Sequence, residues 1–132
     1  MSARRKKGHI EFTQLLLDRG SAAGGGWQPI DGHAPGITQL VLADNLDPHT
    51  RTGSRTRLIH WAQATLLAQP VQHDYREEIL ILEGDLVVGC EPDGSGGTTF
   101  TELAFATRPA GVAHGPFTTR EGCLMLELDL YD

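Results

Sequence analysis

The sequence predicts an all-β protein with a single domain, built as a sandwich or a barrel. The chain has 132 residues, which is long enough to bury one core without disulfides or a structural metal. It contains 16 glycines and 7 prolines, a composition that favours short strands joined by many turns. From Ile37 onward, short β-prone runs alternate with turn residues and no convincing amphipathic helix is present. This pattern is typical of all-β folds.

The first 36 residues are expected to form an arm ahead of a barrel that spans residues 37–132. The arm comprises a basic tail, the segment His9–Gly20 and a glycine-rich connection that ends at Trp27. Its run Leu15–Leu17 fits either a short helix or an edge strand, because periodicity does not decide over so few residues. We expect Trp27 to anchor the arm on the barrel.

The barrel strands are predicted from apolar runs with turn signals between them. Polar and apolar side chains alternate most clearly in Arg55–Ala62, as in a half-buried strand. The residues Leu82–Asp85 predict a tight hairpin, because Gly84 adopts a positive φ at no steric cost. The segments expected to carry strands are Ile37–Ala43, Arg55–Ala62, Pro70–Cys90, Thr98–Phe117 and Cys123–Leu130.

Composition excludes several classes of function. The net charge of −6 argues against a nucleic-acid partner. No apolar stretch approaches the roughly 18 residues of a membrane helix, and the N-terminus lacks the apolar core of a signal peptide, so we expect a cytoplasmic protein without a membrane partner. Cys90 and Cys123 have neither a metal-ligand spacing nor a disulfide pattern. Cys123 is expected to be a small core residue, because no feature suggests a base that would activate it.

Residues His73–Gly84 place a histidine and two glutamates directly before an apolar run. Side chains two and four positions apart in a strand lie on one face, so His73, Tyr75 and Glu77 share a face that Glu78 does not. A buried carboxylate is costly unless it is paired or binds a metal. An inward Glu77 beside a histidine is therefore what a metal site needs.

His114 is the candidate for a third ligand, on a separate strand after the turn Pro109–Gly111. Two imidazoles and one carboxylate leave coordination positions open, as in sites for non-haem iron and catalytic zinc. The other interpretation is a hydrogen-bonded core histidine and a solvent-facing glutamate. The alternation of side chains between the two faces of a strand does not by itself decide between these interpretations.

The spacing of these residues resembles the two motifs of the cupin family. His73, Glu77 and Gly84 match the second His, the Glu and the closing Gly of the first motif, and PAGVAH matches P-x-G-x2-H of the second, with His114 as the ligand. The stretches EEILILEG, RPAGVAHGPF and EGCLMLEL are similar to cupins related to acetylacetone-cleaving dioxygenases and to the C-terminal domain of zinc-binding anti-sigma factors. The resemblance covers about Ile37–Leu130.

The resemblance implies a small double-stranded β-helix, a jelly-roll barrel with RmlC-like architecture, that is commonly a homodimer. A divalent metal ion would lie in its mouth, with iron favoured and zinc, manganese or nickel as alternatives. The sequence departs from the family pattern at three positions. Val71 replaces the first His of the H-x-H pair, Thr118 replaces the Asn that closes the second motif, and Leu103 replaces its leading Gly. Three of the four usual ligands therefore remain.

The resemblance implies an enzyme of the dioxygenase type, acting on a small oxygenated substrate such as a diketone, and favours an oxygenase over a hydrolase or an isomerase. The alternatives are a zinc- or ligand-binding sensor module without catalysis and a metal-free barrel that binds a small organic molecule. His60 either substitutes for the missing ligand, if it faces inward, or is structural. Tyr75 either donates a hydrogen bond to a bound oxyanion or lines the mouth.

The remaining polar and aromatic residues are expected in the core, on the outer side of the barrel or at the surface. Trp61 and Phe117 are expected to wall the barrel or fill its core. Arg76 and Arg108 are expected on its solvated outer side, the alternative being that they attract an anionic substrate. The histidines expected at the surface, in loop-like segments, are His9, His33 and His49.

Overall fold

The computed structural model describes residues 7–15 and 26–132, and in this part of the chain all regular secondary structure is β-strand. The strands are β1 (Gln28–Pro29), β2 (Ile37–Asp44), β3 (Ser54–Trp61), β4 (Leu66–Leu67), β5 (Arg76–Gly84), β6 (Leu86–Val88), β7 (Thr98–Phe100), β8 (Phe105–Arg108), β9 (Phe117–Thr118) and β10 (Cys123–Leu130). The predicted all-β barrel is confirmed. Within the same residues, no helix is long and apolar enough to cross a membrane.

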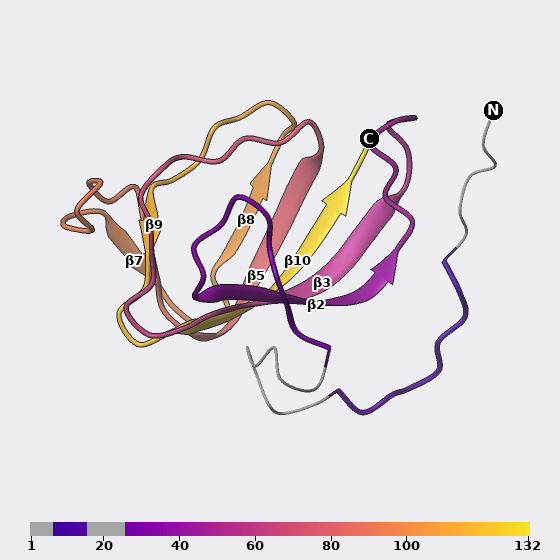
Figure 1. Ribbon diagram of the computed structural model, residues 1–132, viewed down its shortest axis with the longest axis horizontal. Helices are drawn as coiled ribbons and strands as arrows, with labels where there is room; N and C mark the ends of the chain where they lie inside the picture. Colours follow the sequence, from indigo (N-terminus) through magenta and orange to yellow (C-terminus); the bar gives the residue numbers. More distant parts are fainter. Residues whose placement is uncertain (1–6, 16–25) are drawn as a thin grey trace.

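Two antiparallel sheets form the barrel (Figure 1). The larger sheet has the order β1-β2-β3-β10-β5-β8, and the smaller sheet has the order β4-β9-β6-β7. Both orders mix strands that are far apart in sequence, so the topology rests on long-range pairing. The central strand β10 pairs with β3 on one side and with β5 on the other.

The hydrophobic core lies between the two sheets. Alternate residues of β3, β5 and β10 face it, because successive side chains of a strand point to opposite sides. The expected core positions of Trp61, Phe117 and Cys123 are confirmed, since each is at most 5% exposed. The buried core side chains are Ile37, Ile59, Trp61, Leu67, Ile79, Ile81, Leu86, Phe117, Cys123 and Met125.

The predicted hairpin at Leu82–Asp85 is wrong. β5 pairs with β10 and β8, whereas β6 pairs with β7 and β9. The chain therefore passes from the larger sheet to the smaller one at Gly84. Gly84 has the expected positive φ, of 83°, but a Cβ there would lie 2.0 Å from the carbonyl oxygen of Gly122. Glycine is needed here for close backbone packing between segments as well as for its φ.

The arm joins the larger sheet at β1, which pairs with Thr38 and Gln39 of β2. Trp27 is 2% exposed, and its ring meets the ring of His60 edge-on with centroids 6.2 Å apart, as expected for an anchor. Residues 7–15 form neither helix nor strand. The basic tail up to residue 6 and the rest of the leucine run, Leu16 and Leu17, lie outside the described residues.

Candidate metal centre

The three residues predicted as ligands lie together at one end of the barrel. Glu77 is the second residue of β5 and is 4% exposed. His73 precedes this strand, and His114 lies in the connection between β8 and β9. The backbone of His114 forms an isolated bridge with Val71: each N–H donates to the other residue's carbonyl, at 2.9 and 2.8 Å. This bridge holds the two motif segments side by side.

Both imidazoles approach the same carboxylate oxygen. The Nε2 atom of His73 lies 3.1 Å from Oε2 of Glu77, and the Nε2 atom of His114 lies 3.5 Å from it. One ligand atom from each residue lies within 4.8 Å of the other two, and the two imidazole centroids are 5.3 Å apart. The three groups are therefore close enough to share a single cation.

Neighbouring groups orient the two imidazoles. Nδ1 of His114 lies 3.1 Å from the carbonyl oxygen of Val112, and this hydrogen bond requires the proton on Nδ1. In the neutral ring, Nε2 then carries the lone pair that a metal needs. The ring of His73 stacks on the ring of Tyr75, with centroids 4.7 Å apart and planes 7° apart.

Arg108 holds the second oxygen of Glu77. Its Nη1 donates to Oε1 at 2.9 Å, and its guanidinium lies 5.4 Å above the ring of Phe117. The expectation that Arg108 lies on the outer side is wrong, because β8 places it directly opposite Glu77 on the inner face. Arg76 lies outside as expected and donates to Asp132 at 2.7 Å.

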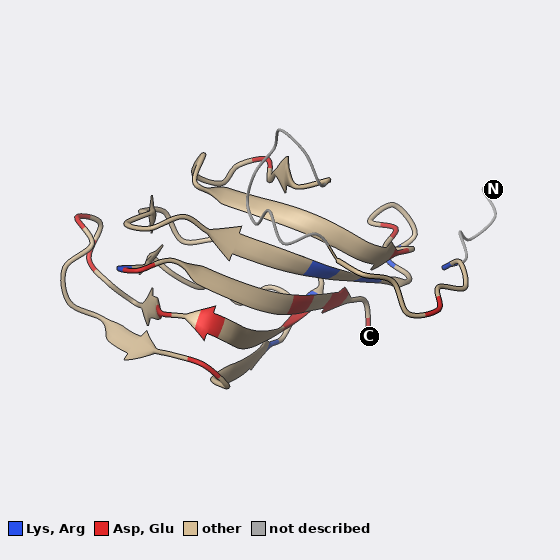
Figure 2. Cartoon of the chain, turned by 90° about the horizontal axis from the view of Figure 1, so that it is seen from below, with Lys and Arg blue, Asp and Glu red and all other residues tan. Residues whose placement is uncertain are grey.

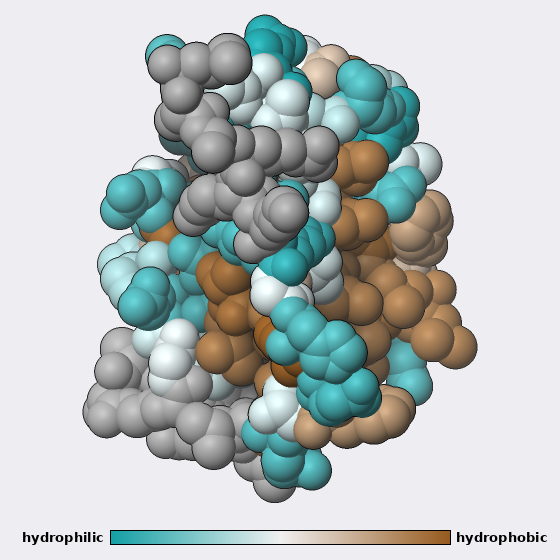
Figure 3. All heavy atoms as spheres, turned by 90° about the vertical axis from the view of Figure 1, so that its right-hand side faces the viewer, coloured by the Kyte–Doolittle hydropathy of each residue, from teal (hydrophilic) through white to brown (hydrophobic). Residues whose placement is uncertain are grey.

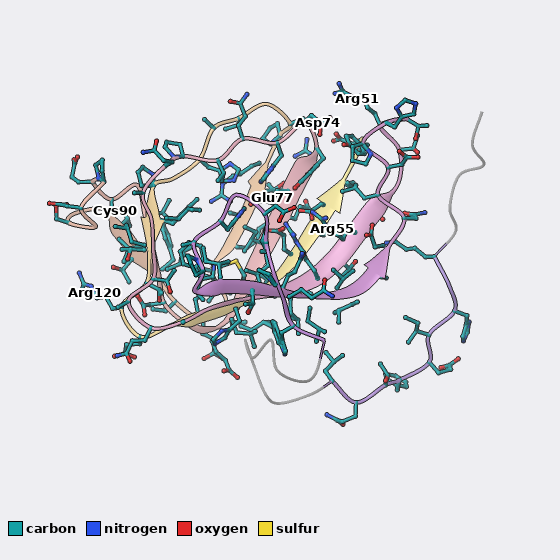
Figure 4. All side chains as sticks on the ribbon, in the orientation of Figure 1. Arg51, Arg55, Asp74, Glu77, Cys90 and Arg120 are labelled. Carbon is teal, nitrogen blue, oxygen red and sulfur yellow. The ribbon has the colours of Figure 1, made fainter. Side chains whose placement is uncertain are left out.

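A row of four charged residues crosses the inner face of the larger sheet. Arg55, Asp129, Glu77 and Arg108 are direct cross-strand neighbours on β3, β10, β5 and β8. Figure 2 shows the charged residues of β3, β10 and β5 side by side toward one end of the sheet. Figure 4 shows Glu77 and Arg55 near the centre of the molecule, with Arg120 toward its periphery.

Arg57 and Glu127 form a further charged pair beside this row, in which Nε of Arg57 donates to Oε2 of Glu127 at 2.8 Å. Within the row, Nε of Arg55 donates to Oδ2 of Asp129 at 2.9 Å. The carboxylates of Glu77, Glu127 and Asp129 also lie within 4.8 Å of one another. Each of the three already has a guanidinium partner, on Arg108, Arg57 and Arg55 respectively, so this carboxylate group is explained without a metal.

The burial of Glu127 and Asp129 on β10 was not predicted from the sequence. The signal was present in CLMLELDL, where Glu127 and Asp129 have the same parity as Cys123 and Met125. Two acids facing inward are improbable from composition alone, because buried charges are costly without partners. Their partners come from β3, which only the tertiary structure identifies.

Burial and charge act in opposite directions on the pKa values of the two glutamates. Burial alone would raise the pKa of Glu77, but hydrogen bonds and charge from His114 and His73 outweigh it and hold that pKa well below its usual value. Burial raises the pKa of Glu127 well above its usual value, and the neighbouring charges of Glu77 and Asp129 add to this effect. Glu77 therefore stays ionised.

A cavity of about 40 Å³ surrounds the three candidate ligands. It is large enough for an ion with a water molecule. Val71 lines it, so the position of the missing histidine contributes an apolar wall. His33 also lines it: the residue lies in a loop as expected, but it is half-buried against the cavity and not at the open surface. Burial lowers the pKa of His33, whereas His9 and His49 are exposed as expected.

A second, apolar cavity of about 220 Å³ adjoins the first. Ile79, Leu86 and Arg108 line both cavities. The mouth of the second cavity carries Phe100 and Phe105, which are 43% and 62% exposed. Arg108 therefore stands between the candidate metal centre and an apolar space large enough for part of a small organic molecule.

The two residues predicted as catalytic are placed differently. Tyr75 lies beside His73, and Nη2 of Arg55 donates to its hydroxyl at 3.4 Å; burial raises the pKa of Tyr75. His60 alternates with the core residues Ile59 and Trp61 and so lies on the outer face of β3. The structure does not bring His60 to the cluster, and it does not supply the missing ligand there.

Similar solved structures all share one fold. An RmlC-like cupin from Shewanella frigidimarina has a TM-score of 0.63 at 15% identity, covering 97% of this chain and 96% of that chain. An acetylacetone dioxygenase from Acinetobacter johnsonii has a TM-score of 0.59 at 19% identity, covering 98% of this chain and 80% of that chain. The polyketide cyclase RemF from Streptomyces resistomycificus has a TM-score of 0.63 at 16% identity, covering 89% of this chain and 81% of that chain. No protein-family model and no curated protein matches the sequence significantly.

The protein therefore has the RmlC-like cupin fold, as its two motif fragments predicted. The proteins with this fold include a dioxygenase and a cyclase. Because one fold supports many chemistries, the function has to be argued from the site.

Proposed function

We propose that His73, Glu77 and His114 hold a divalent metal ion and that the protein is a dioxygenase-type enzyme for a small oxygenated substrate such as a diketone. The observation that carries the proposal is the convergence of two Nε2 atoms on one oxygen of Glu77, at 3.1 and 3.5 Å. Two imidazoles and one carboxylate are a common donor set for iron, and also suit zinc, manganese or nickel. Iron is the metal that the proposed reaction favours.

The surrounding residues support this donor set. Arg108 engages Oε1 of Glu77 and leaves Oε2 for the metal. The hydrogen bond from His114 to Val112 fixes which ring nitrogen is available, as second partners of metal-binding histidines do. Val71 adds an apolar wall instead of a ligand, so one side of the metal is left for water or substrate. When bound, the metal would supply Lewis-acid chemistry and, in the case of iron, redox chemistry.

The two adjoining cavities support a compact substrate with a polar end. Its oxygen atoms would face the small cavity, and its carbon skeleton would enter the apolar cavity of about 220 Å³. Arg108 borders both cavities and can attract the negative charge of an enolate. Apolar walls formed by Ile79 and Leu86 exclude water from the reacting end. The similarity to an acetylacetone dioxygenase agrees with a substrate of this size.

A second candidate function is a zinc- or ligand-binding sensor module without catalysis. The small volume of the ligand cavity, about 40 Å³, favours it. That space accepts an ion and a water molecule but not a substrate unless the walls move. In this case the metal would chiefly stabilise the barrel.

Metal content tests the proposal. The protein, purified without added metal, is expected to contain close to one metal ion per chain by elemental analysis. Glu77→Gln and His114→Ala should lose it, whereas His49→Ala, a change at an exposed histidine, should retain it. Equal metal content in all four proteins, or none in the wild type, would contradict the proposed site.

The identity of the metal and oxygen uptake distinguish the two functions. Iron, together with oxygen consumption on addition of a β-diketone, is the result expected for the enzyme. Zinc, no oxygen consumption and a lower Tm after chelation would instead support the sensor module. A metal-free wild type that still binds small organic molecules would leave only the ligand-binding barrel.

A further inference from the structure

The two sheets of the barrel are not joined at the side where β7 and β8 lie. Within the described residues, β7 pairs only with β6 and ends the smaller sheet, whereas β8 pairs only with β5 and ends the larger one. These strands follow each other in the chain but belong to different sheets (Figure 1). The link between them is held against β5, because Ile81 exchanges hydrogen bonds with Leu103 and Ala104. We call the unpaired side between β7 and β8 the seam.

The apolar cavity of about 220 Å³ lies at the seam. Its inner walls are the buried side chains of Ile79, Ile81 and Leu86. Phe100 of β7 and Phe105 of β8 lie at its mouth, and both phenylalanine side chains are exposed. The cavity therefore opens to solvent between the two edge strands.

Of the described residues that line the seam cavity, Arg108 alone is charged. Its Nη1 donates to Glu77, but no described residue accepts a hydrogen bond from its Nε or Nη2. A guanidinium carries five N–H donors in a planar fork that matches the two oxygens of a carboxylate. Glu77 is also contacted by His73 and His114, so its charge does not depend on Arg108 alone. Arg108 therefore has donors left for a second carboxylate.

Exposed apolar surface by itself does not single out the seam. Apolar side chains also gather on the face drawn in Figure 3, which is the side of the molecule away from β7. The seam differs because its apolar walls end at the guanidinium of Arg108. In a mostly apolar pocket, a few polar groups fix the orientation of the ligand. A neutral apolar molecule would leave the free donors of Arg108 unpaired, which is costly, so the charge of the site favours an anion.

We propose that the seam cavity binds a small organic carboxylate, with its carboxylate group on Arg108 and its apolar body between β7 and β8. An engineered apolar cavity of about 150 Å³ binds benzene, so a cavity of about 220 Å³ accepts an aromatic ring with a short side chain. The assignment rests on the proposed function, which places the carbon skeleton of the substrate in the same cavity, and it narrows the substrate to an organic acid. Binding to Arg108 itself requires no metal ion.

Titration calorimetry of the full chain, freed of metal with a chelator, tests the proposal with phenylacetate and its uncharged analogue phenylacetamide. The wild type is expected to bind phenylacetate at least about tenfold more tightly, because hydrogen bonds between charged groups are the stronger ones. Arg108→Met should abolish this preference. Because that change leaves Glu77 buried without its guanidinium, the double variant Arg108→Met with Glu77→Gln is measured as well and should also lack the preference. Glu77→Gln alone, which should lose the metal, should keep it.

The place of binding is tested by filling the cavity. Ala106 lines the cavity, so Ala106→Leu should weaken the binding of both compounds at least about tenfold. Ala62→Leu, the same change at an exposed alanine outside the cavity lining, should bind both as the wild type does. Circular dichroism establishes that the variants are folded.

Three results would overturn the inference. They are a wild type that does not prefer phenylacetate, a preference that survives in folded variants without Arg108, and a folded Ala106→Leu variant that binds as the wild type does. A wild type that contains metal but shows no preference would overturn this inference and leave the metal site standing. A preference for phenylacetate in a protein that never contains metal would support the carboxylate site and contradict the proposed metal site.

Discussion

At the scale of single residues, Glu77 is the centre of the candidate site. One carboxylate oxygen faces two imidazoles and the other accepts a hydrogen bond from Arg108. Period-two alternation predicted that Glu77 and Glu78 point to opposite faces of their strand, and the structure confirms this, with Glu77 inward and Glu78 outward. That the three residues bind metal stays a prediction. Arg108 and His33 reach the cavity through pairing and loop placement that no local pattern reveals.

The substitution Val71→His is expected to tighten metal binding at least about tenfold, because even outer partners of metal ligands change affinity by that much. Val71 lines the ligand cavity, and its backbone pairs with that of His114. Competition with a chelator of known affinity measures the change. Val112→His is the control, because Val112 lies in the connection between β8 and β9 that carries His114 but does not line the cavity. Equal affinity of Val71→His and the wild type would show that position 71 does not face the ion.

Cys123 is expected to resist alkylation in the folded protein. It is 3% exposed, and burial together with the charge of Asp85 raises the pKa of its thiol to about 12. At about pH 8, roughly one thiol in ten thousand is then ionised, and the thiolate is the reactive form. Mass spectrometry after iodoacetamide treatment measures the modification, with the same reaction in denaturant as the positive control. Rapid modification of the native protein would instead indicate a reactive cysteine.

At the scale of elements, the passage from β5 to β6 depends on Asp85. This residue is 8% exposed, and its carboxylate accepts hydrogen bonds from the backbone N–H groups of Arg120 and Glu121, both at 2.9 Å. The hydroxyl of Thr119 donates to the carbonyl oxygen of Asp85 at 2.6 Å. The loop that leads into β10 is thereby tied to the point where the chain changes sheets.

Asp85→Ala is expected to lower the free energy of unfolding by about 2 to 3 kcal/mol, because it leaves two backbone donors without a charged acceptor. Urea unfolding followed by circular dichroism measures the loss. Asp93→Ala removes a similar side-chain acceptor from an exposed turn and should change the stability little. If both variants lost the same amount, the role of Asp85 at the crossing would be wrong.

At the scale of the whole molecule, the barrel is apolar at its core and charged at the end that holds the candidate metal centre. Arg57 is 4% exposed and contacts Glu127 and Gln39. Asp129, which is fully buried, has Arg55 as its partner. Each buried charge thus depends on a residue from another strand, so these pairs tie the larger sheet together.

Arg57→Met is expected to lower the free energy of unfolding by about 3 to 5 kcal/mol, because it strands a buried charge, whereas Arg57→Met combined with Glu127→Leu should recover much of this loss. Urea unfolding of the single and double variants measures both values. Arg76→Met, which breaks the exposed pair with Asp132, serves as the control and should change little. A double variant as unstable as the single one would show that Glu127 is not the partner that matters.

The sequence by itself determined the all-β class, most strand positions and the placement of Glu77 and Glu78 on opposite faces of one strand. Cys123–Leu130 was predicted with the bounds that β10 has, and Ile37–Ala43 differs from β2 by one residue. These features are local, because alternation with period two is set within one strand. The cupin resemblance also came from local spacing, within each of its two fragments.

Only the tertiary structure decided which strands became neighbours. Long-range pairing placed Arg108 opposite Glu77, moved β6 into the other sheet and brought His33 to the cavity. It also gave the buried acids of β10 their arginine partners on β3. A buried charge is acceptable only when its partner is in place, and a partner some 70 residues away cannot be identified from the alternation of a single strand.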